Sequence, residues 1–322
     1  MIVDLHPTED QQMIEASVRA FLADRLPVER LRETVNHGGA AEREAWDELV
    51  ALGLFGLGLP EERGGLGLGL PEEALVARAL GLFLISPSVL AQMIAPHLAD
   101  DDAVRAALIT GETRATFVNR LDDGAGHLID GDGASCAVLL AGGIALVETR
   151  PLVPGVAVAS IDEAIAIARV GGTLKIVPRD VRADRASLLL SAYLTGIAQA
   201  TRDMAVAYAT TREQFGQPIG AFQAIKHMCA DMAKCAAAAE AQVFHTAVTF
   251  GRGLDDSVET AAAALLATDA SLANAKANIQ IHGGMGFTAE CDAHLFLKRA
   301  HVIASLAGSR RVQQRRIVGG RA

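Results

Sequence analysis

The chain has 322 residues, which allows one large domain or two to three smaller ones, with a core that needs no disulfide or metal. Of its residues 51% are hydrophobic but only 4% are aromatic, so the core must be aliphatic, and the abundant alanine and leucine favour helix. The formal net charge of −9 argues against binding to nucleic acid, which depends on lysine and arginine to neutralise phosphates. These properties predict a mainly helical protein.

The cysteines and the apolar stretches bear on where the protein works. No cysteine lies in a CxxC pair or in a metal-ligand pattern, so we expect no metal and interpret all four as small buried hydrophobic residues in a reducing compartment: Cys136, Cys229, Cys235 and Cys291. The first residues are acidic and polar, without the apolar core of a signal peptide. The most apolar stretch, residues 79–98, contains two prolines and is too interrupted for a membrane span. We expect a cytoplasmic protein outside the membrane.

Residues 1–112 are predicted to form an N-terminal helical domain. Thr8 and Gln11 have the spacing of a capping box, and the residues after them keep one apolar face at helical spacing. Trp46 begins a second apolar face, which Gly53 is expected to end as a helix cap. A glycine-rich turn, residues 60–71, precedes a helix that begins at Glu72. The GGLGLG in this turn does not follow a strand, so it is not a dinucleotide-binding loop.

Residues 113–180 are predicted to form a small β domain. Short β-prone runs alternate here with clusters of Asp, Gly and Pro. The runs are residues 115–118, 137–140, 144–147 and 173–177, and an alanine-rich stretch, residues 161–170, interrupts them.

Residues 181–322 are predicted to form a helical bundle. Long helical patterns cover residues 188–211, 222–252 and 257–282, and a shorter one covers residues 292–306. We interpret the arginines near the C-terminus as a solvated helix end: Arg299, Arg310, Arg311, Arg315, Arg316 and Arg321. This order of helices, strands and then helices excludes a parallel Rossmann sheet, in which strands and helices alternate.

Two stretches of the predicted bundle carry motifs that are far more specific for a protein family than the amino-acid composition is. Residues 208–232 read YATTREQFGQPIGAFQAIKHMCADM, and residues 279–290 read IQIHGGMGFTAE. Both closely resemble signature segments of the acyl-CoA dehydrogenase family, and TEDQQ, Trp46 and PEERGG resemble the first domain of that family. The resemblance covers nearly the whole chain. It implies the family fold: an N-terminal helical domain, a middle β domain, here reduced, and a C-terminal four-helix bundle.

The resemblance also implies a flavin cofactor. In the family, an arginine and a glycine pair approach the adenosine-pyrophosphate half of an FAD that the neighbouring subunit mainly holds. An arginine fork suits a phosphate oxygen, and glycines let backbone N–H groups come close. The cofactor-binding residues that we carry over are Arg212, Gln214, Phe215, Gln280, Gly283 and Gly284. For His227 and Asp231 we keep a structural interpretation, with His227 a buried, hydrogen-bonded histidine.

The chain departs from the family at the catalytic base. Family enzymes remove the weakly acidic α-proton of an acyl thioester with a glutamate, while a hydride passes to the flavin. An ungapped count from the GGMG segment places Ala307 at the usual glutamate position. At the alternative base position, on the first helix of the bundle, stands Ala186. The neighbouring substrate-binding aspartate is retained as Asp184, whereas the arginine that accompanies it is replaced by Ser187.

The β domain departs as well. Residues 119–126, NRLDDGAG, replace the family's T-E-P-x-x-G-S-D segment, and GASCAVL replaces the strand whose tryptophan covers the flavin ring. The pattern resembles actinobacterial members of the family that are built as two-plus-two heterotetramers. In these proteins one subunit type carries the base and the other completes the FAD site. They often serve steroid catabolism, and hence lipid metabolism.

The sequence therefore predicts the base-free subunit of an FAD-dependent acyl-CoA dehydrogenase, an oxidoreductase that desaturates an acyl-CoA thioester. A homologous glutamate-bearing subunit would share the FAD, and an electron-transfer flavoprotein or a similar acceptor would take the electrons. Two alternatives remain open. One is an autonomous enzyme with a displaced base, Asp184 or Glu290, and the other is a structural or regulatory scaffold without flavin.

Overall fold

A computed structural model describes residues 4–32, 38–152, 155–172 and 174–319. The N-terminal part is helical, as predicted. Its helices are α1 (Glu9–Arg25), α2 (Ala40–Glu44), α3 (Trp46–Ala51), α4 (Leu70–Leu82), α5 (Pro87–Leu98) and α6 (Asp102–Ile109), with short 3-10 turns at Val28–Arg32, Leu54–Gly56 and Glu61–Arg63. None of the helices in the described ranges combines the length and apolarity that a membrane span requires.

The local signals at the N-terminal helix ends are confirmed. The Thr8 hydroxyl accepts from the backbone N–H of Gln11, whose side chain accepts in turn from the Thr8 N–H, so the predicted capping box is present. Gly53 follows α3 with φ of +72°, in the left-handed conformation of a helix end. Helix α4 begins at Leu70 rather than at Glu72, because the Glu72 carboxylate caps the N–H of Gly69 (2.8 Å).

The middle of the chain forms a six-stranded sheet in the order β4-β3-β1-β2-β6-β5. The strands are β1 (Ala115–Arg120), β2 (Gly126–Ile129), β3 (Cys136–Ala141), β4 (Gly143–Glu148), β5 (Val156–Val158) and β6 (Ile167–Val170). The pair β1–β3 is parallel and the other pairs are antiparallel. Helix α5 packs on β1 and β3, so Phe117 enters the main core while Val118 joins a smaller apolar cluster on the opposite face.

The predicted strand at residues 173–177 is wrong for residues 174–177, and residue 173 lies outside the described residues. This segment runs past the sheet and makes single backbone bonds, such as the one from the Val177 N–H to the Ala141 carbonyl (2.9 Å). Conversely, the alanine-rich stretch contains β6, whose register is set by pairing with β2. Such pairing is a long-range property that a local β-prone pattern does not reveal.

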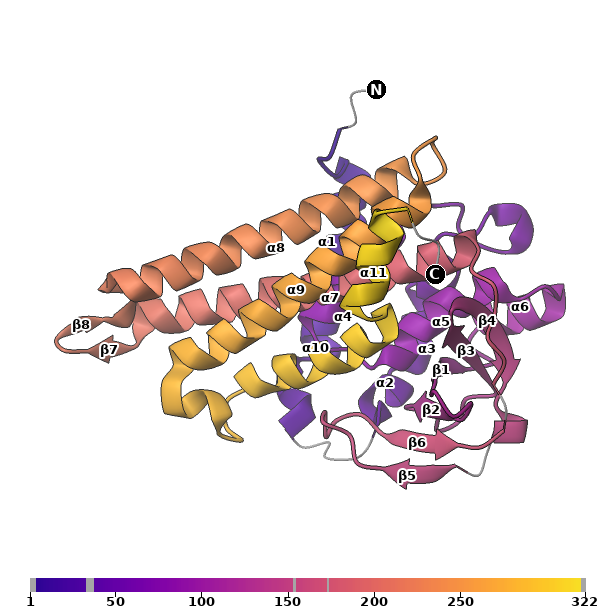
Figure 1. Ribbon diagram of the computed structural model, residues 1–322, viewed down its shortest axis with the longest axis horizontal. Coiled ribbons are helices and arrows are strands. Elements are labelled where there is room, and N and C mark those ends of the chain that lie inside the picture. Colours follow the sequence, from indigo (N-terminus) through magenta and orange to yellow (C-terminus); the bar gives the residue numbers. More distant parts are fainter. Residues whose placement is uncertain (1–3, 33–37, 153–154, 173, 320–322) are drawn as a thin grey trace.

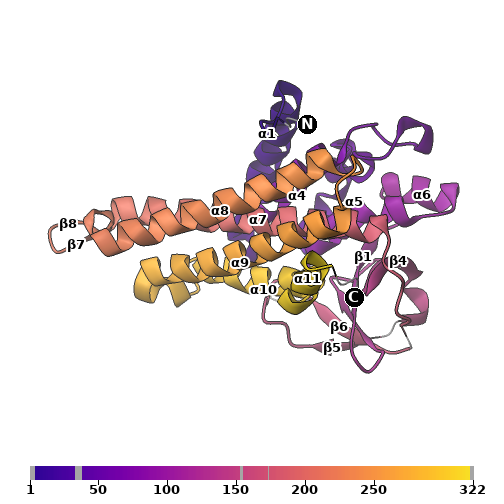
Figure 2. The same cartoon turned by 45° about the horizontal axis from the view of Figure 1, so that its top comes forward.

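The C-terminal part is a helical bundle of α7 (Val181–Thr211), α8 (Gln223–Thr249), α9 (Asp256–His282) and α10 (Ala293–Ala307), followed by the unpredicted α11 (Arg310–Ile317). A two-stranded hairpin, β7 (Glu213–Gln214) and β8 (Gln217–Pro218), joins α7 to α8, and a 3-10 turn, Gly283–Phe287, follows α9. Helices α7 and α8 extend together away from the sheet, and the hairpin lies at their far end (Figures 1 and 2).

Two glycines let α7 pack tightly against α4. A Cβ on Gly81 would lie 2.0 Å from the Tyr193 carbonyl oxygen, and one on Gly196 would lie 2.1 Å from the Arg78 carbonyl oxygen. Only glycine leaves room for the two backbones at this distance. The crossing connects the N-terminal helices with the bundle in one continuous apolar core.

A buried polar junction fixes the sheet and α10 to the N-terminal helices. Arg299, predicted to be solvated, is 1% exposed and donates to the Asp162 carboxylate (2.6 Å), to the carbonyls of Leu84 and Ile85, and to the Tyr193 hydroxyl. Burial opposes its charge, but Asp162 and Tyr193 outweigh burial and raise the pKa of Arg299. The buried charge is tolerated because it is paired with Asp162 and hydrogen-bonded to three further oxygens.

Candidate functional site

The residues carried over as cofactor contacts lie at the far end of the bundle, around what we call the distal hollow. This open hollow of about 390 Å³ is formed where α7 ends, where the β7–β8 hairpin turns and where α9 ends. Its lining residues are Tyr208, Arg212, Gln214, Ile219, Ile281, His282, Gly283, Gly284 and Met285. Of the six predicted residues, four therefore share one hollow: Arg212, Gln214, Gly283 and Gly284.

The ends of two helices shape the distal hollow. Arg212 leaves α7 in an extended conformation, and its backbone carbonyl accepts from Ile219 across the hairpin (2.8 Å). Gly283 ends α9 with φ of +61° and ψ of −137°, a conformation that favours glycine. Behind them, the rings of Tyr208 and His282 stack with centroids 4.1 Å apart. The sequence patterns did not identify these two rings as part of the site.

The distal hollow has the groups that a phosphate needs. The exposed Arg212 guanidinium forms no ion pair with any carboxylate of the described residues. A Cβ on Gly283 or Gly284 would meet nothing within 4 Å, so the backbone there is open to a ligand. A free guanidinium beside an exposed backbone fits the pyrophosphate half of a dinucleotide.

The other two predicted contacts, Phe215 and Gln280, do not line the distal hollow. Phe215 lies at the hairpin tip, 92% exposed and with φ of +53°, and its ring meets Phe222 edge-on at 6.1 Å. Gln280 is exposed on the last turn of α9. A large exposed aromatic ring in a strained backbone conformation is typical of a contact with another molecule.

His227 and Asp231 lie on the exposed face of α8. The prediction of a buried, hydrogen-bonded His227 is wrong, because its side chain faces solvent in the single chain. Asp231 pairs with Lys234 (2.7 Å) on the same exposed face. Among the cysteines, Cys136 is buried as predicted, whereas Cys229, Cys235 and Cys291 are half-buried, and all four are free thiols.

A second hollow, the central cavity, lies where the sheet meets α7, α10 and α11. It measures about 570 Å³ and is lined by the ends of β1, β3 and β4 together with both sides of the α10–α11 turn. Ala307, 6% exposed, lines it, and Ala186 is fully buried in α7. The carboxylate among its described lining residues is the exposed Asp122, at the end of β1. Neither alanine can act as a general base.

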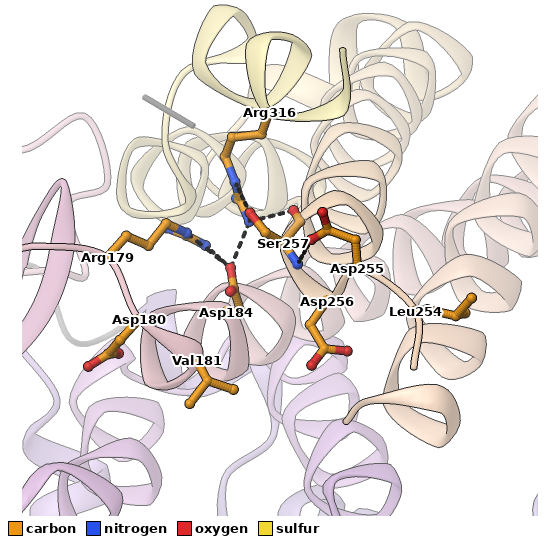
Figure 3. Close-up of a pocket in the computed structure, with 9 residues that line it drawn as sticks. All are labelled: Arg179, Asp180, Val181, Asp184, Leu254, Asp255, Asp256, Ser257 and Arg316. Atoms are coloured by element: carbon orange, nitrogen blue, oxygen red, sulfur yellow. Dashed lines mark hydrogen bonds and ion pairs between the residues drawn. The ribbon is translucent and has the colours of Figure 1, made fainter. Parts of the chain in front are cut away.

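A third hollow of about 390 Å³, the acidic hollow, is drawn in Figure 3. It adjoins the central cavity, because Arg179 lines both. Asp184 reaches it from α7, and both Arg179 (2.6 Å) and Arg316 (2.7 Å) donate to the same Asp184 carboxylate oxygen. Thr260 of α9 donates to that oxygen as well (3.2 Å). Burial, followed by the neighbouring Arg179, lowers the pKa of Arg316 to about 10, so this arginine remains charged at neutral pH.

The two arginines make Asp184 a poor candidate for a displaced base. That carboxylate oxygen already accepts from two guanidiniums and from the Thr260 hydroxyl, so it is not free to take a proton from a substrate. Glu290, the other candidate, is fully exposed after the turn at the end of α9, and backbone and Thr288 hydrogen bonds lower its pKa. Glu290 does not line the central cavity. Within the described ranges, no group of three or more His, Cys, Asp or Glu side chains is placed to hold a metal ion.

The three-part fold and the two signature segments define a flavoenzyme-like architecture, and comparisons with known proteins give its family. The family model of the acyl-CoA dehydrogenase N-terminal domain matches residues 8–100, and that of the C-terminal domain matches residues 182–322. The chain therefore belongs to the acyl-CoA dehydrogenase family. The family and the fold class predicted from the sequence are confirmed.

Two relatives of the chain are acyl-CoA dehydrogenases of Mycobacterium tuberculosis. The chain is 34% identical to acyl-CoA dehydrogenase FadE34 over 83% of its own length but only 40% of that protein, so it spans less than half of FadE34. It is 32% identical to acyl-CoA dehydrogenase IpdE2 over 97% of both chains. Among solved structures, the ChsE4-ChsE5 complex from the same organism superposes with a TM-score of 0.80 at 21% identity, over 98% of both chains. At that identity the likeness shows the fold alone.

Proposed function

We propose that this chain is the base-free subunit of a heteromeric FAD-dependent acyl-CoA dehydrogenase, which completes the FAD site of a glutamate-bearing partner. One observation carries the proposal. Ala307 and Ala186 occupy the two base positions, whereas the distal hollow keeps an unpaired arginine beside open glycine backbone. The chain therefore lacks a general base of its own but keeps the groups that would contact an FAD held by its partner.

The need for a base supports this division of roles. The α-proton of a thioester is weakly acidic, so its removal requires a carboxylate positioned within hydrogen-bond reach. Asp184 is held by two arginines, Glu290 lies outside the central cavity, and Asp122 is exposed to water at the end of a strand. A general base needs an unoccupied carboxylate oxygen held beside the reacting carbon, and the positions of these three carboxylates therefore support removal of the α-proton in the partner.

The distal hollow supports the proposed FAD contact. When bound, the flavin accepts the hydride that leaves the β-carbon of the substrate. In this chain, Arg212 would pair with a pyrophosphate oxygen while the backbone at Gly283 and Gly284 approaches the same group. Gln214 would add an amide, and Gln280 and Phe215, both exposed nearby, would contact the adenosine half or the partner chain.

The assembly is proposed by analogy. The matched chain of the ChsE4-ChsE5 structure has the fold of this chain and is part of a complex. We propose a two-plus-two heterotetramer in the cytoplasm, with a steroid-type acyl-CoA in the partner's pocket and an electron-transfer flavoprotein or similar acceptor. The exposed Phe215, Met285 and Phe287 at the far end of the bundle would become covered in such an assembly.

Co-expression with a glutamate-bearing homologue tests the proposal. A yellow complex that oxidises acyl-CoA only when both chains are present is the expected result. Arg212→Ala should weaken FAD binding by the complex about tenfold, the usual effect of one charge-assisted hydrogen bond. Arg202→Ala, on the same helix but already paired with Asp203, is the matched control and should leave FAD binding unchanged.

Two outcomes would contradict the proposal. Acyl-CoA oxidation by this chain alone would identify an autonomous enzyme with a displaced base. A complex whose flavin content is the same with Arg212→Ala as with the unmodified chain would favour a flavin-free scaffold.

A further inference from the structure

The central cavity remains hollow although its base is gone. Its volume of about 570 Å³ falls within the range of sites that hold small organic molecules. Much of its wall is apolar: Leu140, Ala141, Ile176, Leu190, Leu306, Ala307 and Val312. An apolar wall of this extent gains free energy by burying an apolar molecule, in proportion to the area covered.

One polar group in the wall lacks a partner. Ser187, on α7, is 6% exposed and lines the central cavity, and its hydroxyl makes no hydrogen bond in the described structure. A buried hydroxyl without a partner is costly, and a rotation about its Cα–Cβ bond would let it bond an oxygen of a bound molecule.

The adjoining acidic hollow disfavours ligands that carry phosphate groups. Four of its lining residues carry carboxylates, Asp180, Asp184, Asp255 and Asp256, against the two guanidiniums of Arg179 and Arg316. Both guanidiniums already donate to Asp184, and the four carboxylates leave the hollow with an excess of negative charge. The phosphates of a coenzyme A tail would meet a net negative charge here, which disfavours a CoA ester.

The rim of the central cavity carries mixed charge. Arg120 donates through Nε to the Leu174 carbonyl (2.6 Å), and Asp122 lies two residues further along the chain. Arg179 also lines the cavity but is paired with Asp184, so the charges of the wall give no strong preference for an anionic head group.

We propose that the central cavity of this chain is a second, non-catalytic site for a neutral, mainly apolar molecule that bears a hydroxyl or carbonyl oxygen, and that it excludes CoA thioesters. The apolar wall covers the body of the molecule, and the Ser187 hydroxyl bonds its oxygen. The site goes beyond the proposed FAD contact and does not depend on it, because the central cavity and the distal hollow share no lining residue.

Calorimetric titration of the full chain with three probes tests the site. Decanol and progesterone are neutral probes of different shape, and decanoyl-CoA carries a comparable chain on a phosphorylated tail. We expect at least one neutral probe to bind at micromolar concentration and decanoyl-CoA to bind at least about tenfold more weakly. Binding of neither neutral probe below millimolar concentration, or equal binding of decanoyl-CoA, would overturn the proposal.

Three variants locate the binding. Val312→Trp fills the cavity from a 38% exposed position on α11, and it should weaken binding of the neutral probe about tenfold or more. Val318→Trp adds the same bulk on an 85% exposed residue outside the cavity, and it should leave binding unchanged. Ser187→Ala should weaken binding of the probe about three- to tenfold without loss of stability, since the hydroxyl has no protein partner to lose. Equal effects of the two tryptophan variants would place the probe elsewhere and refute the site, whereas the FAD content of the complex would still test the flavin proposal separately.

Discussion

The Arg316 guanidinium lies 2.7 Å from the Asp184 carboxylate, and their side chains are only 2% and 9% exposed. The pair joins α11, the last helix, to the first turn of α7. Arg316 also donates to the Ser257 carbonyl (2.6 Å) and to the Thr260 hydroxyl (2.9 Å), so the same side chain reaches α9. The prediction that the C-terminal arginines form a solvated helix end is therefore wrong for Arg316 as well as for Arg299.

Arg316→Met is expected to lower the free energy of unfolding by about 2–3 kcal/mol, because it removes a buried partner of Asp184 and leaves only Arg179 to balance the charge. Urea denaturation of the full chain measures the loss. Arg310→Met is the control on the same helix, since its pair with Asp269 is 59% exposed on the arginine side and should be worth less than about 1 kcal/mol. Equal losses in the two variants would show that the buried network does not stabilise the fold.

Asp130 is expected to make stability depend on pH. Burial raises its pKa from 3.8 to about 6, although the Ser86 hydroxyl (2.6 Å) and the Ala166 N–H (2.8 Å) both donate to it. The native state therefore holds this proton more tightly than the unfolded state, and the contribution of Asp130 is greatest at low pH and is lost as pH rises from about 4 to about 6. The loss should be on the order of 3 kcal/mol.

The comparison with Asp130→Asn isolates this effect. Other buried carboxylates act in the opposite direction: burial raises the pKa of Glu73, but His97 and Arg185 outweigh it and the pKa is lowered. Their effect cancels when the two proteins are compared at each pH. The stability of Asp130→Asn relative to the unmodified chain should rise between pH about 4 and about 6. A difference that stays constant over this range would contradict the prediction.

Ala307→Glu is expected to leave acyl-CoA oxidation by the heteromeric complex within about twofold of the unmodified complex. The carboxylate would return to its family position, but under the proposed function no flavin lies beside it in this chain. Steady-state kinetics at saturating substrate give the measurement. A clear gain in turnover per complex would mean that the central cavity binds flavin and substrate.

Alanine substitutions at Gly283 and Gly284 distinguish an effect on stability from an effect on cofactor binding. Gly283→Ala is expected to lower stability by about 1 kcal/mol or more, because alanine is strained at φ of +61°. Gly284→Ala meets no atom within 4 Å and has no left-handed φ, so the isolated chain should keep its melting temperature. Both variants should reduce the flavin absorbance of the purified complex. Full flavin content in Gly284→Ala would mean that the cofactor does not approach this backbone.

Much of the fold could be predicted from the sequence, because its signals are local. The Thr8–Gln11 capping box, the helical end at Gly53 and the long helices of the bundle depend on residues close together in the chain. The strand order, the β6 strand inside the alanine-rich stretch and the failure of the strand at 174–177 depend on pairing partners far away in the sequence.

The sequence by itself determined which residue types are present and which are missing: alanine at positions 186 and 307, and Arg212 and the glycine pair in the two signature segments. Only the tertiary structure decided their surroundings. It placed Arg212, Gln214, Gly283 and Gly284 around one hollow, left Phe215 and Gln280 outside it, and buried Arg299 and Arg316 against aspartates more than a hundred residues away. The physical reason is that burial and charge pairing are set by contacts between distant segments, which no local pattern contains.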